Sequence, residues 1–392
     1  MSISNRLRNK IKQAKKYEES GDREQAPEAY REVARLMKAF AKKAVSKDAE
    51  NRRIEKAKSF LNLAKKIESG EHEVGDSGSE PKPAMDSLPD EYRQMVNSLK
   101  FSSDITLEEI GGLEEAKSDL LLTYGIQLAK KPQNVSVEGW KNVLLFGPPG
   151  TGKTLLAAAV SNHLNAAFFN VKASDLLSKY FGETPKLISA LFDVARGEAD
   201  QGFSVIFIDE FDALSQKRGS RSETNAERRV VSTILAELDG LSEKGEDEAV
   251  LNIGATNAPW DLDNAILSRF QKRIFIPLPD YRARKDIFRL NLEGNGIPVE
   301  ADHDRLAENT EGFSGRDISR LCTEAVSTMV KEKNNDIPEV IGEGINAISG
   351  YELDVEPLTY RDFERALEEV DVALEDAKEL NERYRNFSNS GQ

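Results

Sequence analysis

Apolar residues recur every three or four positions along the first part of the chain. One such set begins at Ile3, a second at Ala26 and a third at Ile54, and short polar turns separate the sets. This spacing places apolar side chains on one face of a helix, and three amphipathic helices joined by short turns pack as a bundle. We therefore predict a three-helix bundle over residues 1–69.

The next segment begins with a stretch that has no hydrophobic pattern. Gly, Ser, Pro and acidic residues dominate positions 70–87, and large apolar side chains are almost absent. A segment of this composition buries too little apolar surface to fold by itself. We predict a flexible linker over residues 70–99.

From about residue 100 onward, short apolar runs alternate with helical stretches. Strands buried on both faces have this continuous apolar character, and alternation with helices is typical of a parallel sheet. The pattern predicts an α/β domain over residues 100–280, whose five-stranded parallel sheet carries helices on both faces. The predicted strands are NVLLFG (142–147), AFFNV (167–171), SVIFI (204–208), VLNIGAT (250–256) and RIFIPL (273–278).

Composition narrows the class of protein. The chain has 392 residues, a net charge of −14 and no apolar run long enough to span a bilayer, and its first residues lack the apolar core of a secretory signal. Its single cysteine, Cys322, fits a small core residue on a helix, and its three histidines have no metal-ligand spacing. We expect a cytoplasmic protein that does not insert into membranes. The acidic balance disfavours general binding to nucleic acid.

The segment GPPGTGKT, residues 147–154, directly follows the first predicted strand and precedes a helical stretch. Glycines in this context let backbone amides surround phosphate groups, and the helix N-terminus faces the anion. Lys153 is expected to reach the β- and γ-phosphates of a nucleotide, and the Thr154 hydroxyl to ligate Mg²⁺. Because every position and both flanking elements match, a chance glycine-rich turn is a weak alternative.

The segment VIFIDE, residues 205–210, ends a buried strand in two carboxylates. Asp209 is expected to hold Mg²⁺ through its water shell, and Glu210 to polarise the water that attacks the γ-phosphate. A strand-end acid without a catalytic role is the alternative for Glu210. We interpret the pair as part of a hydrolase that uses ATP and Mg²⁺.

The stretch from IGGLEEAK (110–117) to GFSGRDISRLCTEA (312–325) resembles a complete AAA ATPase module. Within that family, the segments NAPWDLD (257–263) and SRF (268–270) resemble the katanin, spastin and vacuolar-sorting group. The N-terminal helices resemble that group's microtubule-interacting-and-trafficking (MIT) domain. The resemblance implies a small helical lid domain with a C-terminal helix over residues 281–392, and a ring made of six copies of the chain, a homo-hexamer.

The resemblance also implies roles for single residues. Asn257 would position the attacking water, the segment 110–112 would hold the adenine, and Ser314 and Gly315 would close over it from the lid. Without the resemblance these positions look like ordinary turns. The nucleotide-binding residues that it implies are Ile110, Gly112, Pro149, Gly150, Thr151, Gly152, Lys153, Thr154, Leu155, Asp209 and Gly315.

Members of the family usually present two consecutive arginines to the γ-phosphate of the neighbouring subunit, whereas this chain has Ser268 and Arg269. An arginine in that place contributes roughly 10³- to 10⁵-fold to turnover, and a serine cannot supply its charge. Our hypothesis is that Arg269 carries the role alone. Help from Lys272 or Arg273, or slow hydrolysis, are the alternatives.

The segment KYFG, with Lys179, Tyr180 and Phe181, aligns with the family's first pore loop. Aromatic side chains that face a central channel would grip a client chain through apolar contacts that tolerate many sequences. Taken without the resemblance, the two aromatics fit a packed surface pair.

The resemblance implies protein clients such as filaments of the ESCRT-III type, recruited by the N-terminal bundle, although a spacer role remains open for the bundle. Four alternatives are a general protein unfoldase, a microtubule-severing ATPase of the same group, a nucleic-acid loader and a non-catalytic adaptor. The acidic balance of the chain argues against severing, since severing enzymes hold the acidic tails of tubulin.

Overall fold

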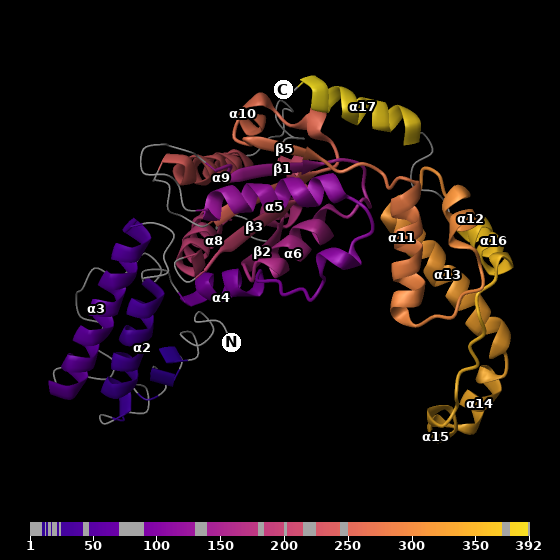
Figure 1. Cartoon of the computed structure of the whole chain (residues 1–392), viewed down its shortest axis with the longest axis horizontal. Helices are drawn as coiled ribbons and strands as arrows, with labels where there is room; N and C mark the ends of the chain where they lie inside the picture. The colour runs from indigo at the N-terminus through magenta and orange to yellow at the C-terminus, as the bar shows by residue number, and fades with distance from the viewer. Residues whose placement is uncertain are drawn as a thin grey trace.

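The computed structural model describes residues 10–11, 13–14, 17, 22, 25–41, 47–69, 90–129, 139–178, 184–199, 202–214, 225–243, 250–370 and 377–390. Figure 1 shows an N-terminal helical region, a central sheet domain and a helical lid. Among these described residues, no helix has the length and apolar content needed to cross a membrane.

The N-terminal region contains the helices α2 (Gln25–Ala41) and α3 (Lys47–Ser69). Their apolar faces meet, with the rings of Tyr30 and Phe60 stacked 5.9 Å apart, and Ala14 from the preceding helical residues is buried in the same cluster. The predicted amphipathic helices are thus confirmed for α2 and α3. Of the first predicted helix, only a few residues are described.

A helix occupies part of the segment predicted to be a flexible linker. This helix, α4 (Asp90–Ser98), buries Tyr92 and Val96 against the sheet domain. Directly after it, the Phe101 amide donates a hydrogen bond of 2.9 Å to the Phe168 carbonyl at the edge strand of the sheet. The linker prediction is therefore wrong for residues 90–98, where two buried apolar side chains give a short polar helix its packing.

The five predicted strands are confirmed, and they form one parallel sheet in the order β2-β3-β4-β1-β5. Alternate residues of β1 enter opposite layers, with Val143 and Leu145 facing one apolar cluster and Leu144 the other. The helices α5 and α6 cover one face, and α8 and α9 cover the other. The strands are β1 (Asn142–Phe146), β2 (Ala167–Lys172), β3 (Ser204–Asp209), β4 (Val250–Thr256) and β5 (Lys272–Phe275).

Helices and single turns connect these strands. They are η2 (Leu107–Glu109), α5 (Glu114–Leu128), α6 (Lys153–His163), α7 (Ala173–Ser178), α8 (Thr184–Ala199), η3 (Phe211–Leu214), α9 (Asn225–Glu243), η4 (Pro259–Asp261) and α10 (Asn264–Leu267).

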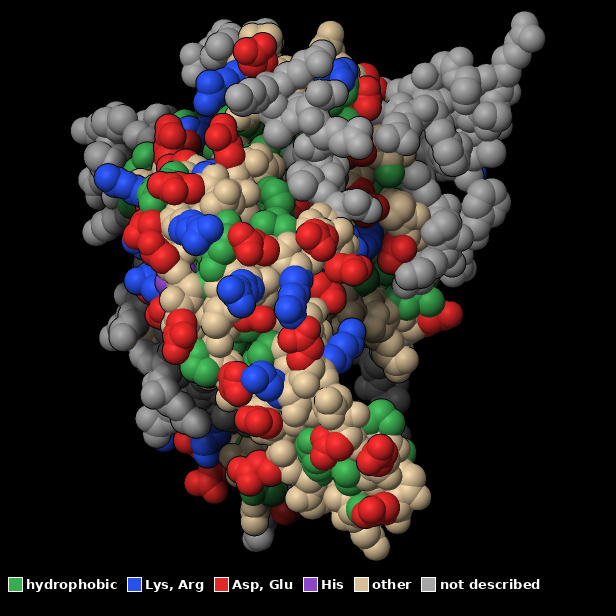
Figure 2. All heavy atoms as spheres, turned by 90° about the vertical axis from the view of Figure 1, so that its right-hand side faces the viewer, with side chains coloured by type: hydrophobic (Ala, Val, Ile, Leu, Met, Phe, Trp, Pro, Cys, Tyr) green, Lys and Arg blue, Asp and Glu red, His purple; other side chains and the backbone are tan. Residues whose placement is uncertain are grey.

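The lid has its own apolar core, in which Phe288 and Phe363 meet edge to face with ring centroids 6.1 Å apart. Figure 2 faces the lid and shows many acidic side chains on this surface, with lysines and arginines among them. The lid elements are α11 (Tyr281–Leu292), η5 (Glu293–Asn295), α12 (His303–Glu308), α13 (Gly315–Lys333), α14 (Ile337–Glu343), α15 (Ile345–Ser349) and α16 (Tyr360–Glu369).

The last helix, α17 (Ala377–Ser390), packs on the sheet domain rather than on the lid (Figure 1). Tyr384 is buried with its ring 4.9 Å from Trp260 and 5.8 Å from Phe275, and the ring of Phe387 lies 5.2 Å from that of Phe146. The prediction that assigned this helix to the lid domain therefore does not describe its packing, since its aromatic residues complete the core beside β1 and β5.

Cys322 lies on α13 in the lid core, as the sequence predicts, and burial raises the pKa of its thiol to about 12. Compared with an unfolded cysteine, its thiolate fraction at pH 8 is roughly a thousandfold lower. We expect a thiol reagent such as DTNB to leave the folded chain unmodified at pH 8 and to label one thiol in guanidinium. Rapid labelling of the folded chain would contradict this packing of the lid.

Candidate functional site

The loop between β1 and α6 has the backbone of an anion-binding turn. Gly147, Gly150 and Gly152 have φ values of +153°, +75° and +91°, a region that glycine enters without steric cost. A side chain at Gly147 would also collide with the backbone of Ile276. Because Gly152 caps the N-terminus of α6, the loop brings amides and the positive end of the helix dipole to one place.

Lys153 is buried at the first position of α6, and its ammonium donates to the carbonyls of Gly147 and Pro148 over 2.8 and 2.7 Å. Burial lowers the pKa of Lys153 to about 8, while the nearby carboxylates of Asp209 and Asp212 act in the opposite direction. The ammonium therefore lies inside the loop, as binding to phosphate requires.

The remaining predicted residues of the loop also lie at this place. The Thr151 hydroxyl donates to the Pro148 carbonyl over 2.9 Å, which closes the turn. Pro149 is half-buried in that turn, and Leu155 is 49% exposed on α6. The structure thus places all of these predicted residues in or directly after the loop between β1 and α6, and their binding roles stay a prediction.

The hydroxyl of Thr154 donates to the carboxylate of Asp209 over 2.9 Å. Hydroxyl and carboxylate oxygens are ligands that Mg²⁺ prefers, so the two residues could hold this ion between α6 and the end of β3. Glu210 follows with φ +54°, and its carboxylate accepts a hydrogen bond of 2.8 Å from the Ser174 hydroxyl on α7. The unusual φ turns the second carboxylate out of the strand direction.

Asn257 directly follows β4, the strand that separates β1 from β3. Its backbone carbonyl accepts a hydrogen bond from the hydroxyl of Tyr384 on α17. The neighbouring Thr256 hydroxyl donates to the Asp212 carboxylate over 2.7 Å. The end of β4 is therefore fixed from two sides, close to the carboxylates that follow β3.

Arg269 lies after α10, where its Nε forms an ion pair of 2.5 Å with Asp239 of α9. Its guanidinium also donates to the Ser268 hydroxyl over 3.0 Å. The arginine thus contacts α9 of its own chain, and within the described part of the chain it forms no hydrogen bond or ion pair with the loop 147–154. This position is compatible with action on a neighbouring copy.

The lid contacts the sheet domain at two glycine positions. Gly112 has φ +69°, and a side chain there would collide with Ala283 of α11. At the second contact, the Arg316 amide donates to the Gly150 carbonyl over 3.1 Å, beside Gly315 at the start of α13. The predicted adenine-binding segments 110–112 and 314–315 therefore both lie at the boundary between the two parts.

Sequence reasoning missed Ser174 and Tyr384, which hold Glu210 and Asn257. Neither stands in a recognisable motif, and their partners lie 36 and 127 positions away. The predicted pore loop, with Lys179, Tyr180 and Phe181, lies outside the described residues, so its role stays a prediction.

Comparison with family models matches residues 143–278 to the ATPase family associated with various cellular activities (AAA), and residues 300–339 to the AAA+ lid domain. The two matches cover the strands, the glycine loop and the helices that follow them. The first match ends at residue 278, just before the first lid helix, α11, and the second lies within the lid.

Curated relatives include the katanin p60 ATPase-containing subunit A1 of Arabidopsis thaliana, 36% identical over 70% of this chain and 53% of the relative. Another is the meiotic spindle formation protein mei-1 of Caenorhabditis elegans, 42% identical over 68% of this chain and 55% of the relative. The chain thus spans about half the length of the curated relatives that it matches.

Solved structures of AAA proteins are also similar to this chain. The crystal structure of the FIGL-1 AAA domain in complex with ADP is 33% identical, with a TM-score of 0.63 over 77% of this chain and 97% of that one. A structure that describes the self-assembly of katanin is 32% identical, with a TM-score of 0.59 over 80% of this chain and 99% of that one.

The lid residues Ser314 and Arg316 leave no room for a side chain at Gly150. In Gly150→Ala the new Cβ would lie 2.5 Å from the Ser314 hydroxyl oxygen, at a φ of +75°. We expect the free energy of unfolding to fall by about 1–3 kcal/mol, measured by thermal or guanidinium unfolding.

Gly240 is the matched control, because it lies on α9 with nothing within 4 Å of a new Cβ. Gly240→Ala should raise the free energy of unfolding by about 0.5–1 kcal/mol. Equal effects of the two substitutions would contradict the contact between Gly150 and the lid.

Proposed function

The chain belongs to the AAA ATPase family, and from this premise we propose that it hydrolyses ATP in a ring of identical subunits and uses the energy to remodel a protein filament. The observation that carries the proposal is the contact of Thr154 with Asp209, next to Glu210. It joins the phosphate-binding loop to two carboxylates at one edge of the sheet.

The loop 147–154 and its Lys153 bind the triphosphate. The amides of the loop and the ammonium of Lys153 would bind the phosphates, and Thr154 and Asp209 would hold the Mg²⁺. When bound, this ion would neutralise charge that develops on the phosphate oxygens. The ADP complex of the FIGL-1 domain supports this use of the site.

Glu210 accepts a proton from the attacking water, which makes the water a better nucleophile. The Ser174 hydroxyl holds the carboxylate at 2.8 Å and so limits its rotamers. Asn257 orients the same water, and the Tyr384 hydroxyl holds the backbone carbonyl of Asn257. These side chains position the water, and their geometry is set before the substrate arrives.

Arg269 completes the site of a neighbouring subunit. Its ion pair with Asp239 must break or rearrange when the guanidinium reaches a γ-phosphate across the interface. The side chains of Arg269 and Asp239 are 36% and 42% exposed, so water screens this ion pair although the Nε atom itself is covered. Self-assembly of the katanin relative supports an oligomeric site, and a hexamer is the form that we propose.

Among the possible clients, microtubules now have better support than filaments of the ESCRT-III type. The relatives are named katanin and meiotic spindle formation protein, and the ESCRT-III hypothesis has no corresponding relative among them. The microtubule-severing alternative of the sequence analysis is therefore the one that we adopt.

The acidic balance of the whole chain argued against binding to the acidic tails of tubulin, but the N-terminal region is basic. Residues 1–69 carry 19 Lys and Arg against 10 Asp and Glu, although the whole chain has a net charge of −14. Exposed basic side chains on α2 and α3 are Arg35, Lys38, Lys58, Lys65 and Lys66. A basic module tethered to an acidic ATPase would hold acidic tails and raise their local concentration near the pore loop.

Mixing two inactive variants tests whether neighbouring subunits share an active site. We expect Glu210→Gln and Arg269→Ala each to reduce ATP turnover, by roughly 10²- to 10⁴-fold and 10³-fold or more, respectively. When the two inactive variants are mixed, some interfaces combine an intact Glu210 with an intact Arg269, so turnover should partly return in a steady-state phosphate-release assay.

Exposed residues outside the site provide matched controls, and both Glu339→Gln and Arg361→Ala should hydrolyse ATP at the rate of the unmodified chain. If the mixture stays inactive although both variants co-assemble, Arg269 does not act across an interface. Full turnover by Arg269→Ala would remove the arginine from the mechanism.

The client hypothesis predicts salt-sensitive binding through the N-terminal region. Glu210→Gln with ATP should co-sediment with microtubules, and replacement of the five exposed basic residues of α2 and α3 by Gln should weaken binding about tenfold or more. The matched control replaces five exposed basic residues of the lid by Gln: Arg282, Arg320, Lys331, Lys333 and Arg361.

Microtubules that lack their acidic tails should bind poorly, and binding should fall as salt rises because exposed charges are screened. Preferential binding to an ESCRT-III-type filament would reject the microtubule client. Equal capture of unrelated unfolded proteins, insensitive to the N-terminal charges, would instead favour a general unfoldase.

A further inference from the structure

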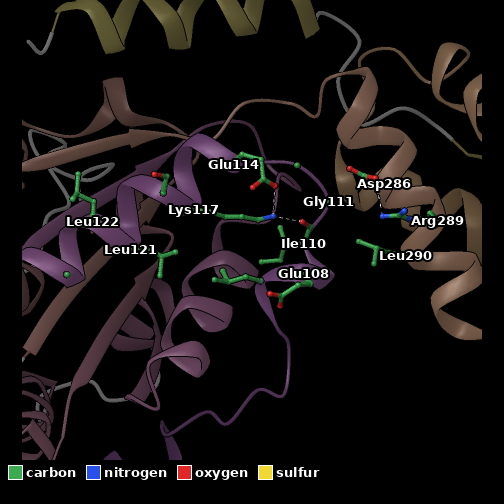
Figure 3. Close-up of a pocket in the computed structure, with 14 residues that line it drawn as sticks. Glu108, Ile110, Gly111, Glu114, Lys117, Leu121, Leu122, Asp286, Arg289 and Leu290 are labelled. Atoms are coloured by element: carbon green, nitrogen blue, oxygen red, sulfur yellow. Dashed lines mark hydrogen bonds and ion pairs between the residues drawn. The ribbon is translucent and has the colours of Figure 1, made fainter. Parts of the chain in front are cut away.

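Lys117, on the first turns of α5, is a buried lysine outside the phosphate-binding loop. Its ammonium donates to the Ile110 carbonyl over 2.7 Å and contacts the Glu114 carboxylate at 2.9 Å. Figure 3 shows the side chain lying along the pocket wall, with its ammonium between these two partners. The lysine therefore joins α5 to the segment 110–112.

The carbonyl is the partner that accounts for the burial of this lysine. The Lys117 side chain is 10% exposed, whereas that of Glu114 is 81% exposed, so water screens the ion pair. A buried ammonium opposes folding unless it forms strong hydrogen bonds. The bond to the Ile110 carbonyl is short, charge-assisted and largely removed from water.

This bond fixes the orientation of the next peptide group. The peptide between Ile110 and Gly111 is trans, so its carbonyl and its N–H point in opposite directions. With the carbonyl held by Lys117, the Gly111 N–H points away from α5. No residue that the structure describes accepts a hydrogen bond from this amide.

We propose that Lys117 is a positioning residue that sets the base specificity of the nucleotide site by aiming the Gly111 N–H at N1 of adenine. The inference rests on the proposed function, because it takes the segment 110–112 as the base-binding segment. Adenine N1 is a hydrogen-bond acceptor, whereas guanine carries a proton on N1 and would place a donor against a donor. A site that bonds to one group rejects analogues that leave its own group unpaired.

The space beside Lys117 allows a conservative substitution. The pocket in Figure 3, of about 750 Å³, opens beside this side chain and is lined by Leu107, Leu121 and Leu290 among others. Lys117→Met keeps the length and the apolar stem of the side chain while removing the donor. The pocket can accept small shifts of the methionine without overpacking.

The experiment measures the affinity of the full chain for ATP, for GTP and for 1-deaza-ATP, in which a C–H replaces N1. We expect the unmodified chain to bind ATP about tenfold or more tightly than either analogue. In Lys117→Met the ratio of the affinity for ATP to the affinity for each analogue should fall toward one. The KM for ATP should rise, while kcat at saturating ATP should stay within about twofold of the unmodified chain. A purely structural role would lower stability without changing the ratio between nucleotides.

Glu114→Gln is the matched control, since it removes the ion pair and leaves the bond to the carbonyl, so it should keep the full preference for ATP. Equal affinity of the unmodified chain for ATP and 1-deaza-ATP would overturn the proposal, and this result needs no variant to fold. An unchanged preference in folded Lys117→Met would also overturn it. Absence of binding to all three nucleotides would instead contradict the proposed function.

Discussion

The hydrogen bond between the Thr154 hydroxyl and the Asp209 carboxylate joins the two halves of the nucleotide site. One partner begins a helix that follows β1, and the other ends β3, so the bond depends on the order of strands in the sheet. Only β4 lies between them, and it delivers Asn257 to the same edge. In open parallel sheets, ligands bind outside the carboxyl ends of the strands, and here that edge collects a lysine, a hydroxyl, two carboxylates and an amide.

The parts that could be predicted from sequence are those whose cause is local. Each strand is a continuous apolar run because both of its faces are buried, and the loop 147–154 is specified by its own glycines and lysine. The hydrogen bond from Tyr384 to Asn257 could not be predicted in this way, because 127 positions separate its partners and neither residue type indicates the other. The helix 90–98 was missed because its apolar pattern is sparse: among residues 91–98, whose burial the structure describes, only Tyr92 and Val96 are buried.

The distribution of charge was obscured by averaging over the whole chain. A net charge of −14 suggested an acidic surface throughout, although residues 1–69 have an excess of basic side chains. Electrostatic attraction acts over a distance of about 8 Å at physiological salt, so a partner responds to the nearest surface and not to the total. The charge of each predicted domain is therefore the quantity that bears on the choice of client.

The return of α17 to the sheet domain has a mechanical consequence. The chain leaves that domain after β5, builds the lid, and comes back to pack Tyr384 and Phe387 beside Trp260 and Phe146. The lid is therefore tied to the sheet domain by the chain on both of its sides. The tie that follows it ends in α17, whose Tyr384 hydroxyl donates to the Asn257 carbonyl, so the same helix that closes the chain also holds the end of β4 in the nucleotide site.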